Sequence, residues 1–180
     1  MNLHELSPAP GSNPKAYRKA VALLAESEFI DIFGVENSLT PAMDLFTKLG
    51  YLGLTCRLNT DAYLQQIGAG HLPHGAVAVA FSHSGSSADT VKALRLAKSH
   101  GAKTIAITNA IGAPLASWAD VTLLTGRDSH TIYGNAIFSR VADTALVDML
   151  YMGVILSGYG RFSTALDESG RMIRDRVFEN

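Results

Sequence analysis

Several features that would place this chain in a specialised class are absent from its sequence. Cys56 is its only cysteine, so no internal disulfide can form, and we expect a reducing compartment, the cytoplasm. The 15 lysines and arginines nearly balance the 16 acidic residues, and no basic run provides an electrostatic footprint for nucleic acid. The N-terminus lacks the charged and apolar blocks of a signal peptide. The most apolar stretch, residues 145–156, contains Asp148 and is too short to cross a bilayer, so no membrane partner is expected.

The residues that are present indicate a well-packed globular protein. Of the 180 residues, 47% are hydrophobic and 17% are charged, which is enough to build a core without disulfides. Residues 1–12 are expected to form a flexible leader, and residues 13–180 a single domain. His71 and His74 flank a proline and lack the spacing of a helical metal-binding pair, so we expect no metal and no cofactor.

Strand-like and helix-like segments alternate along the chain. Asn13-Pro14 is typical of a helix start, with asparagine as cap and proline in the first turn. Gly50 is expected to end the second helix. Short apolar runs rich in β-branched residues predict strands at 29–33, 52–58, 76–81, 103–108 and 120–124. The segments between and after them predict helices at 14–27, 39–49, 61–67, 88–100, 133–156 and 161–176.

This alternation predicts an α/β protein, a three-layer αβα sandwich with right-handed crossovers. The five strands are expected to form a parallel sheet in the order 2-1-3-4-5. That order places the switch point between the first and third strands, and ligands bind at such points beyond the carboxyl ends of the strands.

The turn from Ser82 to Ser87 is the most informative segment. Four serines and Gly85 lie between an apolar strand and a helix, so hydroxyls and backbone N–H groups meet where the helix dipole favours an anion. The turn holds no lysine or arginine, which favours a phosphate bound by neutral donors. The alternative is that Ser86 and Ser87 only cap the helix, with Asp89 completing a capping box.

A second turn, Gly34-Val35-Glu36-Asn37-Ser38, follows the first strand. On its own it is a weak motif, because many turns combine glycine with small polar residues. In the predicted strand order, however, both turns open into the same crevice. Turn chemistry and topology therefore indicate one binding site.

Together these segments resemble the SIS (sugar isomerase) domain, a flavodoxin-like phosphosugar-binding fold. The resemblance covers roughly residues 20–156 and is carried by Gly34–Ser38, Ser82–Ser87, Thr104–Asn109 and Ala119–Val121. It implies that Ser82, Ser84 and Ser87 bind the phosphate, with backbone N–H groups around His83 and Gly85. Asn37 and Ser38 would line the same pocket.

Residues Ser139–Ala142 further resemble the ligand-sensing domain of RpiR/MurR-type transcription regulators. That resemblance implies a homodimer, and contact with DNA only through a helix-turn-helix domain that this chain does not contain. The nearly all-apolar helix around Met149 and Leu150 fits such an interface, although it also fits a central core helix.

Two departures from the family bear on catalysis. Glu36 stands where the family usually has a second glycine, and its carboxylate either faces solvent or lies beside the sugar. Asn135 appears where the isomerases carry a glutamate base, and an amide binds sugar hydroxyls but takes no proton. Glu36 and His130 remain candidate bases, while His83 is expected to contribute its backbone and turn its side chain away.

Three functions follow in order of support. The first is a sensor domain that binds a phosphorylated sugar, and the second is a stand-alone aldose–ketose isomerase acting on sugar phosphates. A dinucleotide-binding domain ranks third, because Glu36 breaks the glycine pattern that a pyrophosphate requires.

Overall fold

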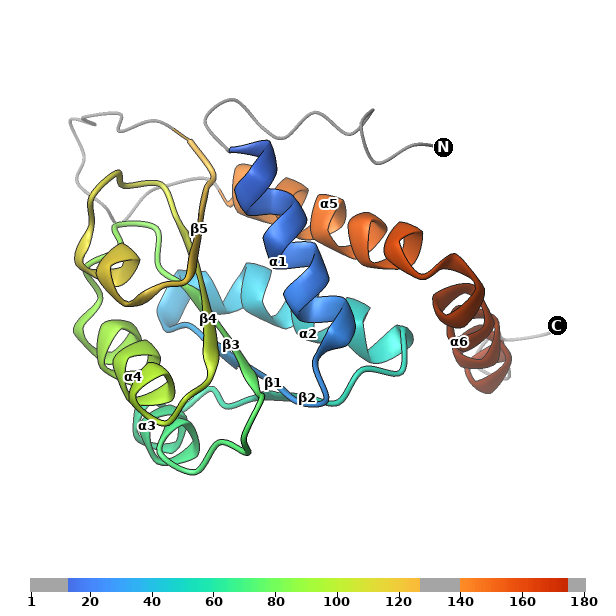
Figure 1. The fold of residues 1–180 in the computed structure, drawn as a ribbon, viewed down its shortest axis with the longest axis horizontal. Helices are drawn as coiled ribbons and strands as arrows, with labels where there is room; N and C mark the ends of the chain where they lie inside the picture. The colour runs from blue at the N-terminus through green and yellow to red at the C-terminus, as the bar shows by residue number, and fades with distance from the viewer. Residues whose placement is uncertain (1–12, 127–139, 175–180) are drawn as a thin grey trace, which may run out of the picture.

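A computed structural model describes residues 13–126 and 140–174 of the chain. Five parallel strands form one sheet in the order β2-β1-β3-β4-β5, which confirms the predicted order (Figure 1). The expected leader, residues 1–12, lies outside the described residues. The strands are β1 (Ile30–Phe33), β2 (Cys56–Leu58), β3 (Val77–Phe81), β4 (Lys103–Thr108) and β5 (Val121–Leu124).

Helices cover both faces of this sheet. On one face lie α1 (Pro14–Glu26), α2 (Leu39–Tyr51) and α5 (Val141–Ser157), and on the other lie α3 (Ala62–Ala69) and α4 (Ala88–Ser99) (Figure 1). The last helix, α6 (Tyr159–Met172), turns away from α5. Two short 3₁₀ helices, η2 (Glu36–Ser38) and η3 (Pro114–Trp118), lie in loops. The predicted three-layer sandwich is therefore confirmed.

The size of the side chains along β3 accounts for the two layers. Successive residues of a strand point to opposite faces. Val77, Val79 and Phe81 belong to the core shared with α1, α2 and α5, while Ala78 and Ala80 belong to the core shared with α3 and α4. The small alanines leave room for α4 to pack close to the sheet. All five residues are buried, as expected for a central parallel strand.

The end of α2 and the start of β2 differ from the prediction. Helix α2 continues through Gly50 to Tyr51 and ends in a Schellman turn, with Gly53 N–H donating to Gly50 O at 3.0 Å and Leu54 N–H to Leu49 O at 3.2 Å. Gly53 takes the left-handed conformation, φ +71°, that this turn requires. The chain from Leu52 is used in the turn, so β2 begins only at Cys56.

Cys56 has a structural role in the fold. Its thiol packs against the larger core, and burial raises its pKa to about 12. It is therefore protonated near neutral pH and a poor nucleophile.

Helix α5 explains most of its apolar sequence within the fold. Leu146, Leu150 and Val154 are fully buried, and the Tyr17 hydroxyl of α1 donates to the Met149 carbonyl at 2.6 Å. The central-core alternative thus accounts for its buried side, and the homodimer remains a prediction. Of the predicted helix, residues 133–139 lie outside the described residues. Arg140, expected inside that helix, is instead its N-cap.

The lengths and compositions of the described helices bear on whether one of them could cross a membrane. Within residues 13–126 and 140–174, no single helix has both the length and the apolar composition needed to cross a bilayer. Only α5 and α6 taken together have the required length and apolar composition, and the chain bends by 117° between the two helices.

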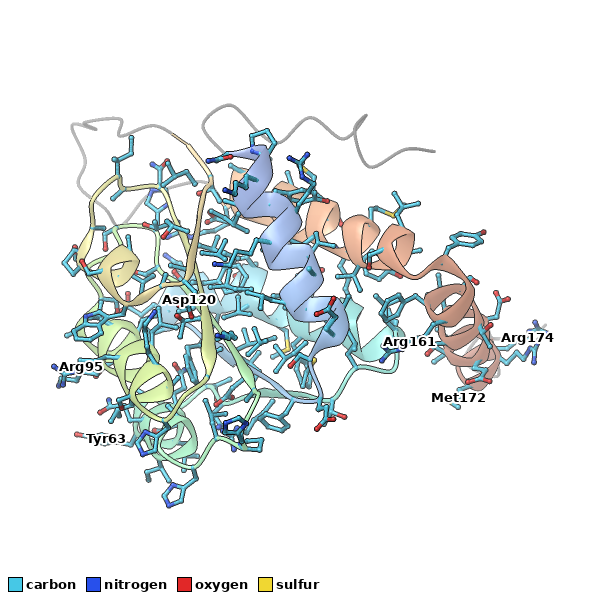
Figure 2. All side chains as sticks on the ribbon, viewed as in Figure 1. Tyr63, Arg95, Asp120, Arg161, Met172 and Arg174 are labelled. Carbon is cyan, nitrogen blue, oxygen red and sulfur yellow. The ribbon has the colours of Figure 1, made fainter. Side chains whose placement is uncertain are left out.

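Asp120, just before β5, links this strand to β4 and α4 through hydrogen bonds (Figure 2). Its carboxylate accepts hydrogen bonds from the Lys98 ammonium at 2.7 Å and from the Thr104 N–H and hydroxyl at 2.9 and 3.0 Å. Partial burial alone would raise the pKa of Asp120, but the hydrogen bonds from Lys98 and Thr104 outweigh it and lower the pKa below its ordinary value. The ionised form is therefore the one that stabilises this edge.

Asp120→Asn is expected to lower the free energy of unfolding by about 1–2 kcal/mol at pH 7. A carboxyl group with a depressed pKa in the folded state contributes stability above its unfolded pKa and loses it as the pH falls through the folded value. The difference between wild type and variant should therefore shrink below about pH 4. Urea unfolding across pH 3–7 measures it, with Asp167→Asn on exposed α6 as the control. An equal difference at both ends of the range would contradict this role.

Candidate functional site

A polar pocket lies at the predicted switch point. Its volume is about 360 Å³, and three parts of the chain line it: the loop after β1, the loop after β3 with the first turn of α4, and the residue before α5. Strands β1 and β3 are neighbours, and α2 and α4 leave them toward opposite faces of the sheet. The lining residues are Val35, Glu36, Asn37, Ser38, Ser82, His83, Ser84, Ser87, Asp89 and Arg140.

A second hollow of similar volume lies between α1 and the α5–α6 corner. Its lining combines Val21, Ala25 and Phe162 with three charged residues, Arg18, Glu26 and Arg161, and it has a single hydroxyl, from Ser157. The polar pocket has four serine hydroxyls and two helix N-termini, so it is the better candidate for binding a polar ligand.

Hydrogen bonds from Gln65 of α3 hold the loop after β1 in place. The Gly34 N–H donates to the Gln65 side-chain oxygen at 3.2 Å, and the Gln65 amide donates to Gly34 O at 2.7 Å and to Asn59 O at 2.8 Å. Gln65 is 1% exposed, so these bonds form away from water. Sequence analysis did not single out Gln65, because it lies in a predicted helix 31 residues from the glycine that it holds.

Glu36 has an unusual backbone conformation. Its φ is +51°, the only positive value among the non-glycine residues that the structure describes. This left-handed conformation costs a residue with a Cβ about 1–2 kcal/mol, which explains why glycine suits the position. The side chains of Glu36 and Asn37 are exposed at the rim of the pocket.

The serine turn after β3 is held by its carbonyl groups. Ser82 O accepts from Gly85 N–H at 3.0 Å, His83 O from Asn109 N–H at 3.0 Å, and Gly85 O from Leu115 N–H at 2.9 Å. The Gly85 N–H is thus used inside the turn, although it was expected near the phosphate. Gly85 has φ +62°, a conformation open to glycine.

The serine N-caps at the pocket differ from the N-caps of α1 and α3. Asn13 and Asp61, which cap α1 and α3, accept hydrogen bonds from the helix backbone with their side chains. Ser38 and Ser87, which cap α2 and α4 at the pocket, make no side-chain cap hydrogen bond. The capping alternative therefore does not account for Ser87, whose hydroxyl accepts only a 3.3 Å bond from Thr90.

Arg140 brings a positive charge that the sequence analysis missed. Its side chain is 14% exposed and forms an ion pair with Asp143, whose Oδ2 lies 3.5 Å from Nη1. A cation at a helix N-terminus opposes the helix dipole, which would have marked Arg140 as unusual. That signal was hidden because the helix was predicted to begin near residue 133, so Arg140 seemed to lie within it.

His83 belongs to the serine turn and lies within the electrostatic influence of Arg140 and Asp143. Its ring nitrogen Nε2 is 3.5 Å from the Asn109 side-chain nitrogen. Burial lowers the pKa of His83, the positive charge of Arg140 lowers it further, and Asp143 opposes both. The ring is half-buried at the pocket wall and neutral near pH 7.

The other polar residues considered for the site are Asp89, His130 and Asn135. Asp89, on the first turn of α4, lines the pocket and accepts a 3.3 Å hydrogen bond from Gln66. His130 and Asn135 lie outside the described residues. No group of three or more His, Cys, Asp and Glu side chains gathers as a metal site in the described part of the chain.

Comparison with known proteins agrees with this geometry. Residues 23–153 match the family described as SIS domain. A helix-turn-helix (HTH) transcriptional regulator of Caldanaerobacter subterraneus is 30% identical over 168 residues, 93% of this chain and 60% of the regulator. The HTH-type transcriptional regulator RpiR of Escherichia coli K12 is 24% identical over 161 residues, 89% of this chain and 54% of RpiR. This chain thus spans little more than half the length of these relatives.

Solved structures show the same fold. The Vibrio vulnificus NanR protein complexed with ManNAc-6P has a TM-score of 0.87 at 24% identity, covering 94% of this chain and 64% of NanR. The sugar isomerase domain of an RpiR transcription factor from Sphaerobacter thermophilus has a TM-score of 0.79 at 24% identity, covering 89% and 88%. The chain belongs to the SIS domain family, among relatives that are RpiR-type and other HTH-type transcriptional regulators.

Proposed function

We propose that this chain binds a phosphorylated sugar in the polar pocket and serves as the ligand-sensing part of an RpiR-type transcription regulator. The observation that carries the proposal is the pair of serine N-caps, Ser38 and Ser87, whose side chains make no cap hydrogen bond in their own helices. Both face a pocket that also contains Ser82, Ser84 and the mostly buried Arg140. Such donors at helix N-termini suit a phosphate group.

The pocket offers different chemistry at its two ends. The turn of Ser82, Ser84 and Ser87 at the start of α4 would hold the phosphate. The sugar would extend toward Glu36 and Asn37 at the exposed rim, where a carboxylate and an amide can bind hydroxyl groups. A volume of about 360 Å³ lies within the range of small-molecule sites and suits a monosaccharide phosphate.

The comparisons support a sensor. NanR, which has this fold, was solved with a sugar phosphate, and the curated relatives are HTH-type regulators. Because this chain spans little more than half of their length, contact with DNA would belong to a part of such a regulator outside the match. A homodimer acting in the cytoplasm completes the proposal, since a sensor transmits ligand binding by a difference in affinity between two states.

The isomerase remains the second candidate, because two carboxylates, Glu36 and Asp89, line the pocket. A putative sugar-phosphate isomerase of Listeria monocytogenes also has this fold, with a TM-score of 0.65 at 19% identity. Isomerisation requires a base that takes the proton from the carbon next to the carbonyl.

Binding without proton exchange is the result expected of a sensor. A thermal-shift screen against hexose, pentose, amino-sugar and N-acetyl-sugar phosphates should yield at least one that raises Tm, because a ligand of the native state stabilises it. Incubated with the protein in deuterated buffer, that ligand should keep the proton next to its carbonyl, as followed by proton NMR.

The matched unphosphorylated sugar serves as the control for the phosphate. Rapid loss of the proton signal with wild-type protein would show an isomerase. If the signal then persisted with Glu36→Gln, Glu36 would be identified as the base. If no sugar phosphate changed Tm, the proposed ligand class would be wrong.

A further inference from the structure

Arg140 is mostly buried, and part of its guanidinium has no hydrogen-bond acceptor in the described part of the chain. Its Nε and Nη1 atoms are inaccessible to solvent and have no hydrogen-bond partner within residues 13–126 and 140–174. A guanidinium presents five N–H donors in a rigid fork and stays charged at any pH that a protein tolerates. Removing such donors from water without an acceptor is unfavourable, so the arrangement favours an incoming acceptor.

Asp143 satisfies the charge of Arg140 only in part. The 3.5 Å separation of Nη1 and Oδ2 is an ion pair rather than a good hydrogen bond. Asp143 is buried, at 8% exposure, and Arg140 is mostly buried, at 14%, so water screens this pair weakly. Asp143 lies in the first turn of α5, where the helix dipole favours an anion.

The pocket places a second anion within reach of the same guanidinium. Arg140 lines the pocket together with Ser82, Ser84 and Ser87, where the proposed phosphate would lie. A bound phosphate and Asp143 would therefore both draw on one cation. A phosphate monoester carries nearly two charges at pH 7 and presents three oxygens, so it pairs with the fork more strongly than a carboxylate 3.5 Å away.

We propose, resting on the proposed function, that Arg140 binds the phosphate of the ligand and that Asp143 competes for it as an internal counter-ion. Without ligand, Asp143 holds the guanidinium at the start of α5. With ligand, the guanidinium turns from Asp143 toward the pocket and donates to the phosphate, and the Arg140–Asp143 pair loosens. Asp143 thus sets the affinity for the ligand without touching it, and binding changes the contacts of the first turn of α5.

The two partners give opposite expectations in a titration with inorganic phosphate at pH 7.5. Arg140→Gln should weaken phosphate binding about 10- to 100-fold, because charge-assisted hydrogen bonds are lost. Asp143→Asn should strengthen it several-fold, because the competing charge is gone. In the Arg140→Gln background, Asp143→Asn should have no further effect, since the two act through one interaction. Two-dimensional NMR of the His83 ring follows both binding and charge, because this ring lies near Arg140 and Asp143.

The ligand-free spectra test the pair independently of binding. Arg140→Gln should raise the pKa of His83 and Asp143→Asn should lower it, in keeping with the opposite signs of the two charges. Arg140→Lys keeps the charge but not the fork, so it should bind phosphate with intermediate affinity. The controls are Arg161→Gln on α6 and Asp148→Asn on the exposed side of α5, neither of which lines the pocket.

Each outcome decides a separate question. Unchanged phosphate affinity in Arg140→Gln, or weaker binding in Asp143→Asn, would overturn the competition. If Arg140→Gln left buried Asp143 unpaired and failed to fold, the double variant, which removes both charges, would supply the comparison. A sugar phosphate that bound wild type and Arg140→Gln equally would leave the proposed function standing and this inference refuted. If Arg140→Gln lost the binding of inorganic phosphate but wild type bound no sugar phosphate, this inference would stand and the proposed function would be refuted.

Discussion

Replacing Gly85 by alanine is expected to destabilise the protein by about 3 kcal/mol or more and to abolish ligand binding. Two effects add at this position. The φ of +62° is unfavourable for any residue with a Cβ, by about 1–2 kcal/mol. An added Cβ would also lie 2.3 Å from the Ala113 Cβ and 2.9 Å from the Thr108 Oγ1, so the serine turn would have to move. Urea unfolding gives the stability, and calorimetric titration with a sugar phosphate gives the affinity.

Gly101 offers a matched control for the backbone effect alone. Its φ is +86°, and an added Cβ would meet nothing within 4 Å. Gly101→Ala should therefore cost only about 1 kcal/mol and leave binding intact. Adding Ala113→Gly to Gly85→Ala removes the nearest atom and should restore part of the stability. Equal losses in Gly85→Ala and Gly101→Ala would show that the close approach to Ala113 is unimportant.

The sheet and its switch point could be predicted because their signals are local. The run from Val77 to Phe81 is apolar at every position, and this identifies a buried parallel strand without knowledge of its neighbours. Alternating strands and helices then restrict the strand order, since crossovers are right-handed. The two turns that line the pocket follow β1 and β3, so their meeting also followed from the order of the strands.

Arg140 and Gln65 could not be predicted, because their roles depend on distant partners. Arg140 reaches the serine turn across 53 to 58 residues of sequence, and the helix boundary that sets its position was placed too early. Gln65 lies in an ordinary helical segment, and only the fold brings its amide to Gly34. In both cases a polar side chain acts through a contact that no sequence spacing encodes.

Capping and ligand binding could not be separated from sequence either. Both interpretations place a serine at the N-cap of a helix, so the sequence around Ser38 and Ser87 does not distinguish them. Hydrogen-bond geometry separates them. The caps away from the pocket, Asn13 and Asp61, bond to their helices, and the two serines at the pocket do not. A cap that forgoes its own helix leaves a backbone donor and a hydroxyl for something else.

The double variant Ser82→Ala, Ser84→Ala is expected to bind a sugar phosphate more than about 100-fold more weakly than wild type. Each hydroxyl removed is a donor to a charged group, worth roughly 1.5–3 kcal/mol. Ser82 is only 3% exposed, but its backbone fastens the turn: its N–H donates to Ile107 O at 3.1 Å and its carbonyl accepts from Gly85. Alanine keeps both bonds, so stability should change by less than about 1 kcal/mol.

Ser86 provides the control for this variant within the same turn. Its side chain is exposed, its hydroxyl donates to Ser84 O at 3.3 Å, and it does not line the pocket. Ser86→Ala should therefore leave the affinity unchanged in the same calorimetric titration. Undiminished affinity in the folded double variant would mean that the phosphate lies elsewhere, since two pocket hydroxyls would then contribute nothing. Because the double variant is expected to keep the stability that Gly85→Ala loses, it isolates the chemistry of the serine turn from its shape.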